Sequence, residues 1–306
     1  MPASYTPLRY PGGKSRLANF VKLVLLKNDL SPVHYVEPYA GGAGLGVTLL
    51  LHGFARSITI NDIDPLVHAF WTSAVLDTEA LCKRIASTRV SMAEWYRQRE
   101  VIEERRNRST LEVGFAAFFL NRTNRSGIMR GGVIGGQKQT GKWKISARFT
   151  KKTLIGRIRA IAAFRDRIHI HNIDACDLLN KPMPKAKGRI FWYLDPPYYV
   201  KGQELYENHY TSSDHAQLVE FINDLKDPWI VSYDDVPEIR KLFRRHKHIA
   251  YGISYSVADH YGGKEVAFFS PRLRLPSIES PLSVSPTTVK KQVRAYLTKH
   301  PEQAAV

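Results

Sequence analysis

The run Arg189-Ile-Phe-Trp-Tyr-Leu194, followed directly by Asp195-Pro-Pro-Tyr198, decides the fold of this chain. The first stretch has the aromatic and branched residues of a buried strand, and the two prolines must end that strand. A carboxylate and an aromatic ring are thereby fixed at a strand's carboxyl end, where open α/β sheets bind their ligands. The same residues are also compatible with an ordinary strand-to-turn junction that ends in a surface tyrosine.

The corner after this strand has the groups that a planar amine requires. The Asp195 carboxylate and the Pro196 carbonyl can each accept one hydrogen of an exocyclic amino group, while Tyr198 or Tyr199 stacks on the ring that bears it. The candidate catalytic residues are therefore Asp195, Pro196, Pro197 and Tyr198.

Helical and strand patterns alternate on both sides of this corner, as a doubly wound α/β sheet requires. We expect strands at 33–37, 57–62, 167–171, 189–194, 229–233 and 265–270, and helices at 15–27, 43–52 and 213–225. Between about 64 and 164 the pattern is helical, with helices at 78–88, 92–106 and 111–120. The prediction is a Rossmann-like catalytic domain (1–75 and 160–275), a mainly helical insert (76–159), and a mobile C-terminal tail (276–306) with a short helix at 289–299.

The composition is that of a folded globular protein and argues against a membrane-spanning, secreted or disulfide-rich protein. Hydrophobic residues make up 43% of the 306, and no apolar run reaches the roughly 18 residues of a membrane span. The amino terminus lacks the apolar stretch of a signal peptide. Cys82 and Cys176 are too few for a disulfide framework. This scarcity of cysteines makes a reducing, cytoplasmic location the expectation. The histidines lack paired ligand spacing, so we expect no metal site.

The strongly positive net charge of the chain indicates that it binds a polyanion. Lysine and arginine total 45 against 28 acids, which gives a net charge of +17 and a pI near 9.8. From Arg122 to Arg159 there are eleven basic residues and no acid, with glycines between them. Such a segment can follow a phosphate backbone and read guanine edges, although a solvated flexible loop is the alternative. The candidate DNA contacts are Arg122, Asn124, Arg125, Arg130, Lys138, Lys142 and Lys144.

A glycine-rich turn, Val36-Glu-Pro-Tyr-Ala-Gly-Gly-Ala-Gly-Leu-Gly46, lies between the first predicted strand and the next helix. Its glycines let a ligand approach the backbone, and Asp62 ends the following strand where it can bind ribose hydroxyls. The spacing is not G-x-G-x-x-G, and Glu37 would repel a pyrophosphate. A carboxylate there suits a cationic group such as the sulfonium or amino acid end of S-adenosylmethionine, or it caps a helix.

The stretch Leu8-Arg-Tyr-Pro-Gly-Gly-Lys-Ser15 invites a P-loop interpretation that fails, because the template requires glycine where Leu8 stands. The turn is still suited to clamping a ligand. Lys14 can meet a carboxylate, and Tyr10 can cover an adenine or methionine group. By itself the stretch would be an ordinary entry to a helix.

Taken in order, these stretches resemble the Dam-type DNA adenine-N6 methyltransferases, the alpha group, over roughly residues 7–270. The ordered set is Arg9-Tyr-Pro-Gly-Gly-Lys14, Val36-Glu-Pro-Tyr-Ala-Gly-Gly-Ala-Gly44, Asn61-Asp62, Asn121-Arg-Thr-Asn-Arg-Ser-Gly127, Asn172-Ile-Asp174, Asp195-Pro-Pro-Tyr198, Asp214-His215 with Leu218, and Lys264-Glu-Val-Ala-Phe-Phe-Ser270. Each motif is weak alone, but their order is specific.

The resemblance implies methyl transfer from S-adenosylmethionine to the N6 amine of an adenine flipped out of double-stranded DNA, with GATC as the site. It implies cofactor contacts at Tyr10, Lys14, Glu37, Pro38, Gly41, Asp62, Asp174 and Asp195. It further suggests a bacterial, phage or mobile-element origin and a monomer or weak dimer. A cognate restriction endonuclease as partner is left open.

Two departures from the family pattern, and several rival functions, accompany this prediction. Tyr10 stands where relatives often have tryptophan, and the insert is unusually basic and glycine-rich, which leaves the recognised sequence open. One rival is methylation of a cytosine or RNA amine; aspartate at 195, where cytosine-amine enzymes tend to have serine, favours adenine. Another is a DNA-binding scaffold without turnover. An NAD-dependent oxidoreductase is disfavoured by the glycine spacing.

Overall fold

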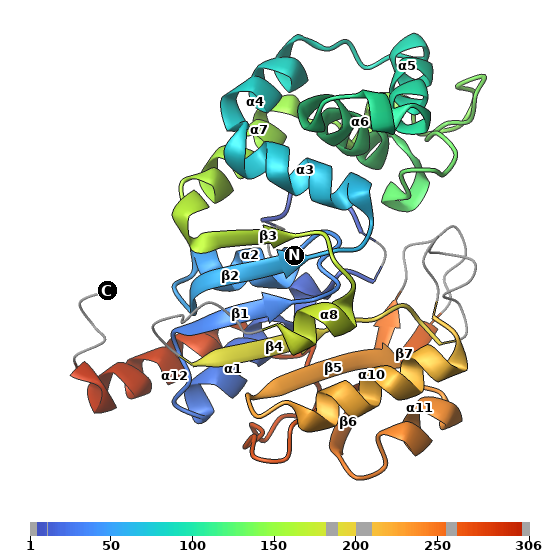
Figure 1. The fold of residues 1–306 in the computed structure, drawn as a ribbon. Coiled ribbons are helices and arrows are strands. Elements are labelled where there is room, and N and C mark those ends of the chain that lie inside the picture. The colour runs from blue at the N-terminus through green and yellow to red at the C-terminus, as the bar shows by residue number, and fades with distance from the viewer. Residues whose placement is uncertain (1–4, 11, 182–188, 200–209, 255–261, 302–306) are drawn as a thin grey trace.

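A computed structural model describes residues 5–10, 12–181, 189–199, 210–254 and 262–301, and its centre is a seven-stranded sheet (Figure 1). The strand order is β3-β2-β1-β4-β5-β7-β6; β1 to β5 run parallel, and β7 runs antiparallel to both of its neighbours. The strands are β1 (Val33–Glu37), β2 (Ala55–Asn61), β3 (Ile168–His171), β4 (Ile190–Leu194), β5 (Trp229–Asp234), β6 (Lys247–Ser254) and β7 (Gly262–Phe269). The predicted α/β class is confirmed.

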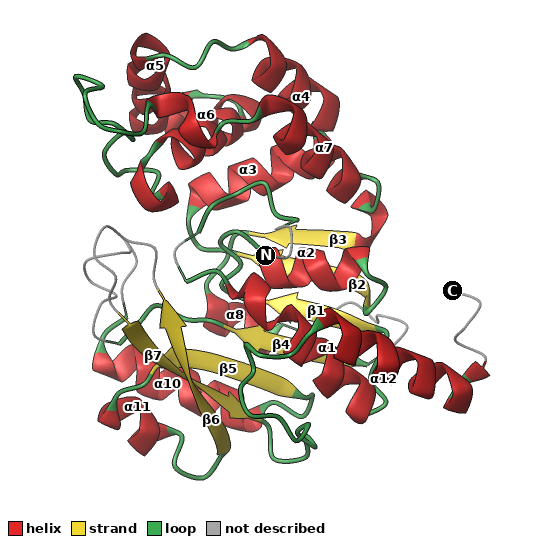
Figure 2. Ribbon diagram, turned by 180° about the vertical axis from the view of Figure 1, so that it is seen from behind, coloured by secondary structure: helices red, strands yellow, loops and turns green. Residues whose placement is uncertain are grey.

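The central strands are buried on both faces because helices cover both sides of the sheet (Figure 2). Side chains alternate between two apolar clusters, so Tyr35 of β1 belongs to one cluster and Val36 to the other. The first cluster includes α1 (Ala18–Lys27) and α2 (Gly44–Leu51). The second includes α8 (Ala175–Asn180), α10 (Ser212–Asp224) and α11 (Pro237–Leu242). This sandwich accounts for the near-continuous apolar strand sequences.

A helical layer lies beyond the β3 edge of the sheet (Figures 1 and 2). In this layer α6 packs against both α3 and α5, α4 packs against α7, and α3 also contacts β3. The helices are α3 (Pro65–Leu76), α4 (Thr78–Ser87), α5 (Met92–Glu103), α6 (Thr110–Thr123) and α7 (Lys151–Ala162). The predicted insert 76–159 therefore shares its packing with α3, which precedes it in sequence.

The basic, glycine-rich segment between α6 and α7 is folded back on the helical layer. Met129, Val133, Ile145 and Phe149 are buried in the main apolar cluster. The interpretation as a freely solvated loop is therefore wrong, since apolar residues every few positions anchor the segment while its lysines remain exposed.

The C-terminal part differs from the predicted mobile tail. Helix α12 (Pro286–Lys299) packs against α1, and its Val289 and Tyr296 are buried. The Tyr296 hydroxyl donates a hydrogen bond to the Ser31 carbonyl at 3.1 Å. The predicted helix at 289–299 is confirmed, but its apolar side chains dock it on the sheet domain. Residues 302–306 of the predicted tail lie outside the described residues.

Candidate active site

A cavity of about 1000 Å³ opens at the carboxyl ends of β1 to β4, facing the helical layer. It is formed where the parallel strands end and their loops diverge, the usual ligand position in such sheets. All the predicted cofactor residues line it, namely Tyr10, Lys14, Glu37, Pro38, Gly41, Asp62, Asp174 and Asp195. Pro197, a predicted catalytic residue, and Arg122, a predicted DNA contact, line it as well. Segments that are far apart in sequence thus converge on one site.

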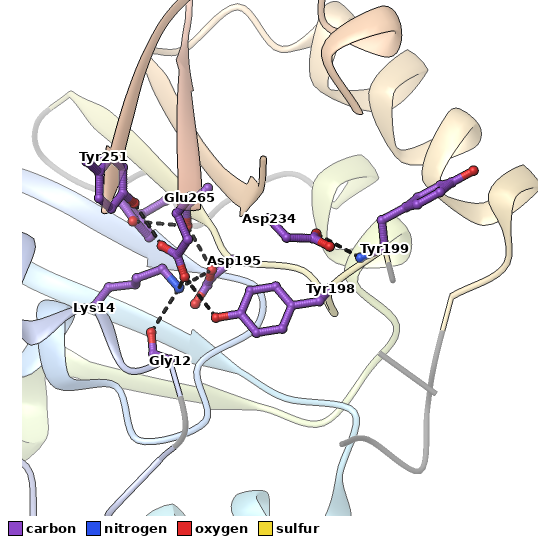
Figure 3. Close-up of polar contacts among 10 residues, drawn as sticks. Gly12, Lys14, Asp195, Tyr198, Tyr199, Asp234, Tyr251 and Glu265 are labelled. Atoms are coloured by element: carbon purple, nitrogen blue, oxygen red, sulfur yellow. Dashed lines mark hydrogen bonds and ion pairs between the residues drawn. The ribbon is translucent and has the colours of Figure 1, made fainter. Parts of the chain in front are cut away.

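Asp195 lies at the end of β4 and is held through one carboxylate oxygen (Figure 3). Its Oδ1 is 2.9 Å from the Lys14 Nζ and accepts a hydrogen bond from the Ser232 Oγ at 2.7 Å. Lys14 Nζ also donates to the Gly12 carbonyl at 2.8 Å. Because the Asp195 side chain remains 22% exposed, the carboxylate can still meet a ligand in the cavity.

A second carboxylate, Glu265 on β7, organises this cluster and was not predicted as a site residue. It is fully buried and accepts hydrogen bonds from the Lys14 Nζ at 3.1 Å, the Tyr198 hydroxyl at 2.8 Å and the Tyr251 hydroxyl at 3.0 Å (Figure 3). Its signal in the sequence was the stretch after Lys264, in which an acid interrupts an apolar strand. Figure 3 shows Tyr198 turned toward Glu265, and this residue is buried.

The buried charges alter the ionisation of their neighbours. Burial alone would lower the pKa of Lys14, but the carboxylates of Asp195 and Glu265 reverse this and raise it above its usual value. Burial raises the pKa of Glu37 well above its usual value, and the nearby Asp195 carboxylate adds to this shift. Lys14 is therefore a firmly charged group between two acids, whereas the donors near Glu37, the Gly46 N–H and the Tyr35 hydroxyl, do not offset the effect of its burial.

The glycine-rich turn brings its backbone close to Tyr10. Gly41 has a φ of +45°, and a Cβ there would come within 2.7 Å of the Tyr10 ring. The Gly41 carbonyl accepts a hydrogen bond from the Trp71 indole of α3 at 2.9 Å, and its N–H donates to the Asp62 Oδ2 at 2.8 Å. Only glycine fits this position, since both the φ angle and the ring exclude a side chain.

Residues at the carboxyl ends of β2 and β3 form another part of the cavity. Asn61 donates to the carbonyls of Pro38 and Ile173 at 2.9 and 3.0 Å, which ties the loops after β1 and β3 together. Asp62 accepts backbone N–H bonds on both oxygens, and burial raises its pKa to about 7. Ile63, which sequence reasoning did not select, is 45% exposed and lines the cavity beside it.

The predicted DNA contacts fall into three groups. The first group is exposed on the basic segment and consists of Arg125, Arg130, Lys138, Lys142 and Lys144. Arg122 is half-buried and lines the cavity. Asn124 is fully buried; it donates to the carbonyls of Ile128 and Met129 and accepts from the Trp95 indole at 2.6 Å. Its prediction as a DNA contact is therefore corrected, because its side chain holds the basic segment in place.

The parallel sheet with its antiparallel β7, the glycine-rich turn after β1 and the acid-Pro-Pro-Tyr corner after β4 define a Rossmann-like methyltransferase. The sequence matches the family of D12 class N6 adenine-specific DNA methyltransferases over residues 10–256, and the chain belongs to this family. It is accordingly an adenine-specific DNA methyltransferase, with DNA as substrate and a requirement for a methyl donor.

Two solved structures resemble this chain at low similarity. A candidate RNA methyltransferase from Pyrococcus horikoshii is 9% identical with a TM-score of 0.42, over 88% of this chain and 89% of that one. The rRNA methyltransferase AviRa from Streptomyces viridochromogenes is 16% identical with a TM-score of 0.38, over 85% of each chain. No curated protein matches the sequence. Within the described residues, none of the helices has the length and apolarity to cross a membrane.

Proposed function

We propose that the chain transfers the methyl group of S-adenosylmethionine to the N6 amine of an adenine flipped out of double-stranded DNA. The observation that carries this proposal is the state of Asp195. Among the described residues its Oδ1 alone is engaged, by Lys14 and Ser232, and the side chain is exposed to the cavity. A fixed carboxylate with an available oxygen is what an exocyclic amino group requires as acceptor.

The cavity residues fit S-adenosylmethionine. Glu37 is buried, and the Gly46 N–H and the Tyr35 hydroxyl are the donors that favour its charged form, yet burial still holds its pKa well above the usual value. A cationic or N–H donating group of a ligand would further stabilise this carboxylate. Asp62 is placed for ribose hydroxyls, and the exposed Ile63 beside it can cover a base. When bound there, the cofactor supplies an electrophilic methyl group on a sulfonium. Lys14, Glu37, Asp62 and Asp174 are the charged residues proposed to hold it.

The protein's own contribution is to position the amine. The lone pair of adenine N6 is delocalised into its ring, which makes the amine a poor nucleophile. Hydrogen bonds from this amine to Asp195 and to the Pro196 carbonyl favour a more pyramidal nitrogen and aim its lone pair. The Lys14 ammonium, itself held by Glu265, fixes the carboxylate's orientation. Tyr198 is buried against Glu265 and does not line the cavity, so its predicted stacking on the base has no support in this arrangement.

The position of Asp195 supports the proposal of base flipping. The carboxylate lies in a cavity lined by residues from several loops, and an adenine paired within a duplex cannot bring its amino group there. We propose that the target nucleotide rotates into this cavity while the exposed basic segment holds the duplex. GATC is the recognition sequence to be tested first, on the strength of the family resemblance.

The test compares Asp195→Ala with Asp166→Ala, a matched control at an exposed acid just before β3. We expect Asp195→Ala to lose methyl transfer by at least about 100- to 1000-fold, the usual loss on removing a contact to the transition state. Binding of DNA, measured by anisotropy, should be largely retained, because it depends on phosphate contacts elsewhere. Substantial turnover in this variant would refute the assignment.

Sequencing the modified DNA identifies the base and its context. Labelled methyl transfer into unmethylated genomic DNA, followed by single-molecule sequencing, should place the methyl group on adenine in one short motif. Methyl groups on cytosine, or transfer only to RNA, would support the rival substrates. Cofactor binding without transfer to either polymer would support the inactive scaffold.

A further inference from the structure

Four arginines, which we call the arginine cluster, gather where the N-terminal loop meets the helical layer: Arg9, Arg122, Arg148 and Arg157. Three of their guanidinium groups are held by backbone carbonyls. Arg9 donates to Asn124 at 3.0 Å, Arg157 to Thr6 at 3.1 Å, and Arg122 to Arg148 at 2.7 Å through its Nε. The cluster is thus positioned by the protein's backbone and does not consist of freely moving surface side chains.

No carboxylate forms an ion pair with any of these four guanidinium groups within the described ranges. Their charges therefore act on one another. Burial lowers the pKa of Arg122 to about 9, and the charges of Arg9, Arg157 and Arg148 contribute to this shift. Burial, followed by Arg148, also lowers the pKa of Arg9. Like charges brought together without a counter-charge are unfavourable, which points to an anion that they bind.

The cluster borders the active-site cavity. Arg9, Arg122 and Arg157 line the same cavity as Asp195. Arg148 lies on the exposed side, where its guanidinium is 5.4 Å from the ring of Trp143, a side chain that is 56% exposed. The positive charge therefore extends from the interior of the cavity to the outer surface of the basic segment.

We infer that the arginine cluster binds the phosphodiester backbone directly beside the flipped nucleotide. This inference rests on the proposed function and adds a phosphate site to it. Guanidinium groups are well suited to phosphate oxygens, with which they form paired, charge-assisted hydrogen bonds. A nucleotide whose base enters the cavity near Asp195 brings its own phosphates toward the arginines that line the same cavity. The cluster would thus hold the distorted strand after the base has left the stack.

The first experiment measures affinity for duplex DNA as a function of salt concentration. The variants are Arg157→Gln and Arg148→Gln, and the control is Arg159→Gln, two residues along α7 from Arg157 but paired with Glu79 at 2.7 Å. Each cluster variant should bind DNA about tenfold more weakly at low salt. The slope of log K against log salt should fall in magnitude by about 0.9 per lost phosphate contact. The control should keep the wild-type slope.

The second experiment locates the phosphate. Duplexes containing the mapped methylation site carry one uncharged methylphosphonate linkage at a time near the target adenine. Wild-type protein should lose affinity when a linkage adjoining the adenine is neutral, and Arg157→Gln should lose no further affinity at that linkage. Additive losses at every linkage would overturn the inference, because the arginine and the phosphate would then act independently.

The main alternative ligand is the carboxylate of the methyl donor. If calorimetry showed that Arg157→Gln weakens S-adenosylmethionine binding while the salt slope for DNA is unchanged, the phosphate site would be refuted. Arg148→Gln is the variant less prone to a folding defect. Within the described residues its guanidinium group contacts only the ring of Trp143, so little packing is lost when it is replaced. If wild-type protein bound no DNA at all, the proposed function itself would fail.

Discussion

Glu265→Gln is the sharpest test of how the active site is assembled. The wild-type carboxylate accepts hydrogen bonds from Lys14, Tyr198 and Tyr251 while fully buried, and Lys14 in turn pairs with Asp195. The substitution keeps the size of the side chain but removes its charge and turns one acceptor atom into a donor. Either Tyr251 or the Lys14–Tyr198 pair then faces an N–H group in place of an oxygen.

The size of the effect follows from the contacts. Removing one partner of a buried ion pair costs about 3–5 kcal/mol in unfolding free energy. Lys14 keeps Asp195 at 2.9 Å, so the lower end, about 3 kcal/mol, is expected for Glu265→Gln. Tyr251→Phe removes only one hydroxyl donor to the charged acceptor, so about 1.5 kcal/mol is expected. Activity should fall mainly in kcat, because Glu265 positions Lys14 and does not line the cavity.

Two measurements check this prediction: urea unfolding of both variants and methyl transfer at saturating DNA and cofactor. A loss of kcat in Glu265→Gln with nearly unchanged KM for DNA would identify Glu265 as a positioning residue. Tyr251→Phe is the matched control, since it leaves the carboxylate and the Lys14 ion pair intact. The reasoning is refuted if Glu265→Gln unfolds at the wild-type urea concentration and keeps the wild-type kcat.

Two further predictions concern Asp62 and Asn124. Because burial raises the pKa of Asp62 to about 7 and ribose hydroxyls need the carboxylate form, affinity for S-adenosylmethionine should weaken as pH falls below about 7, by up to tenfold per unit. Calorimetry across this range should show a flat profile for Asp62→Asn; a persisting slope would implicate another group. Asn124→Ala should lower the unfolding free energy by about 2–3 kcal/mol, since three buried polar partners lose their bonds. Unchanged urea unfolding with weakened DNA binding would instead restore Asn124 as a DNA contact.

The sheet was largely predictable because its central strands are buried on both faces. Continuous apolar runs such as the one ending at Leu194 indicate such strands without knowledge of their neighbours. Strand β6 was missed because it is at the edge of the sheet and pairs only with β7. Its sequence, Lys247–Ser254, begins with a lysine and a histidine and includes an exposed glycine, so no local pattern distinguishes it from a loop.

The cavity was predictable for a different reason. Parallel strands place all their carboxyl ends at one edge, so acids such as Glu37, Asp62 and Asp195 had to be near one another once the strands were assigned. Glu265 could not be found in this way, since it is on an antiparallel strand. Asn124 was misassigned because composition shows that a segment is basic but not which of its polar side chains face inward.

The distribution of charge around the cavity unites the two proposals. The acids Asp62, Asp174 and Asp195 come from the loops that follow strands, whereas Arg9 comes from the N-terminal loop and Arg122 and Arg157 from the helical layer. Under the proposed function, the acids would attract a cationic methyl donor and the arginines a polyanionic strand. The ion pair between Asp195 and Lys14 joins the carboxyl end of β4 to the N-terminal segment of the chain. The in-line transfer proposed above would require the donor and the target amine to meet at this ion pair from opposite sides.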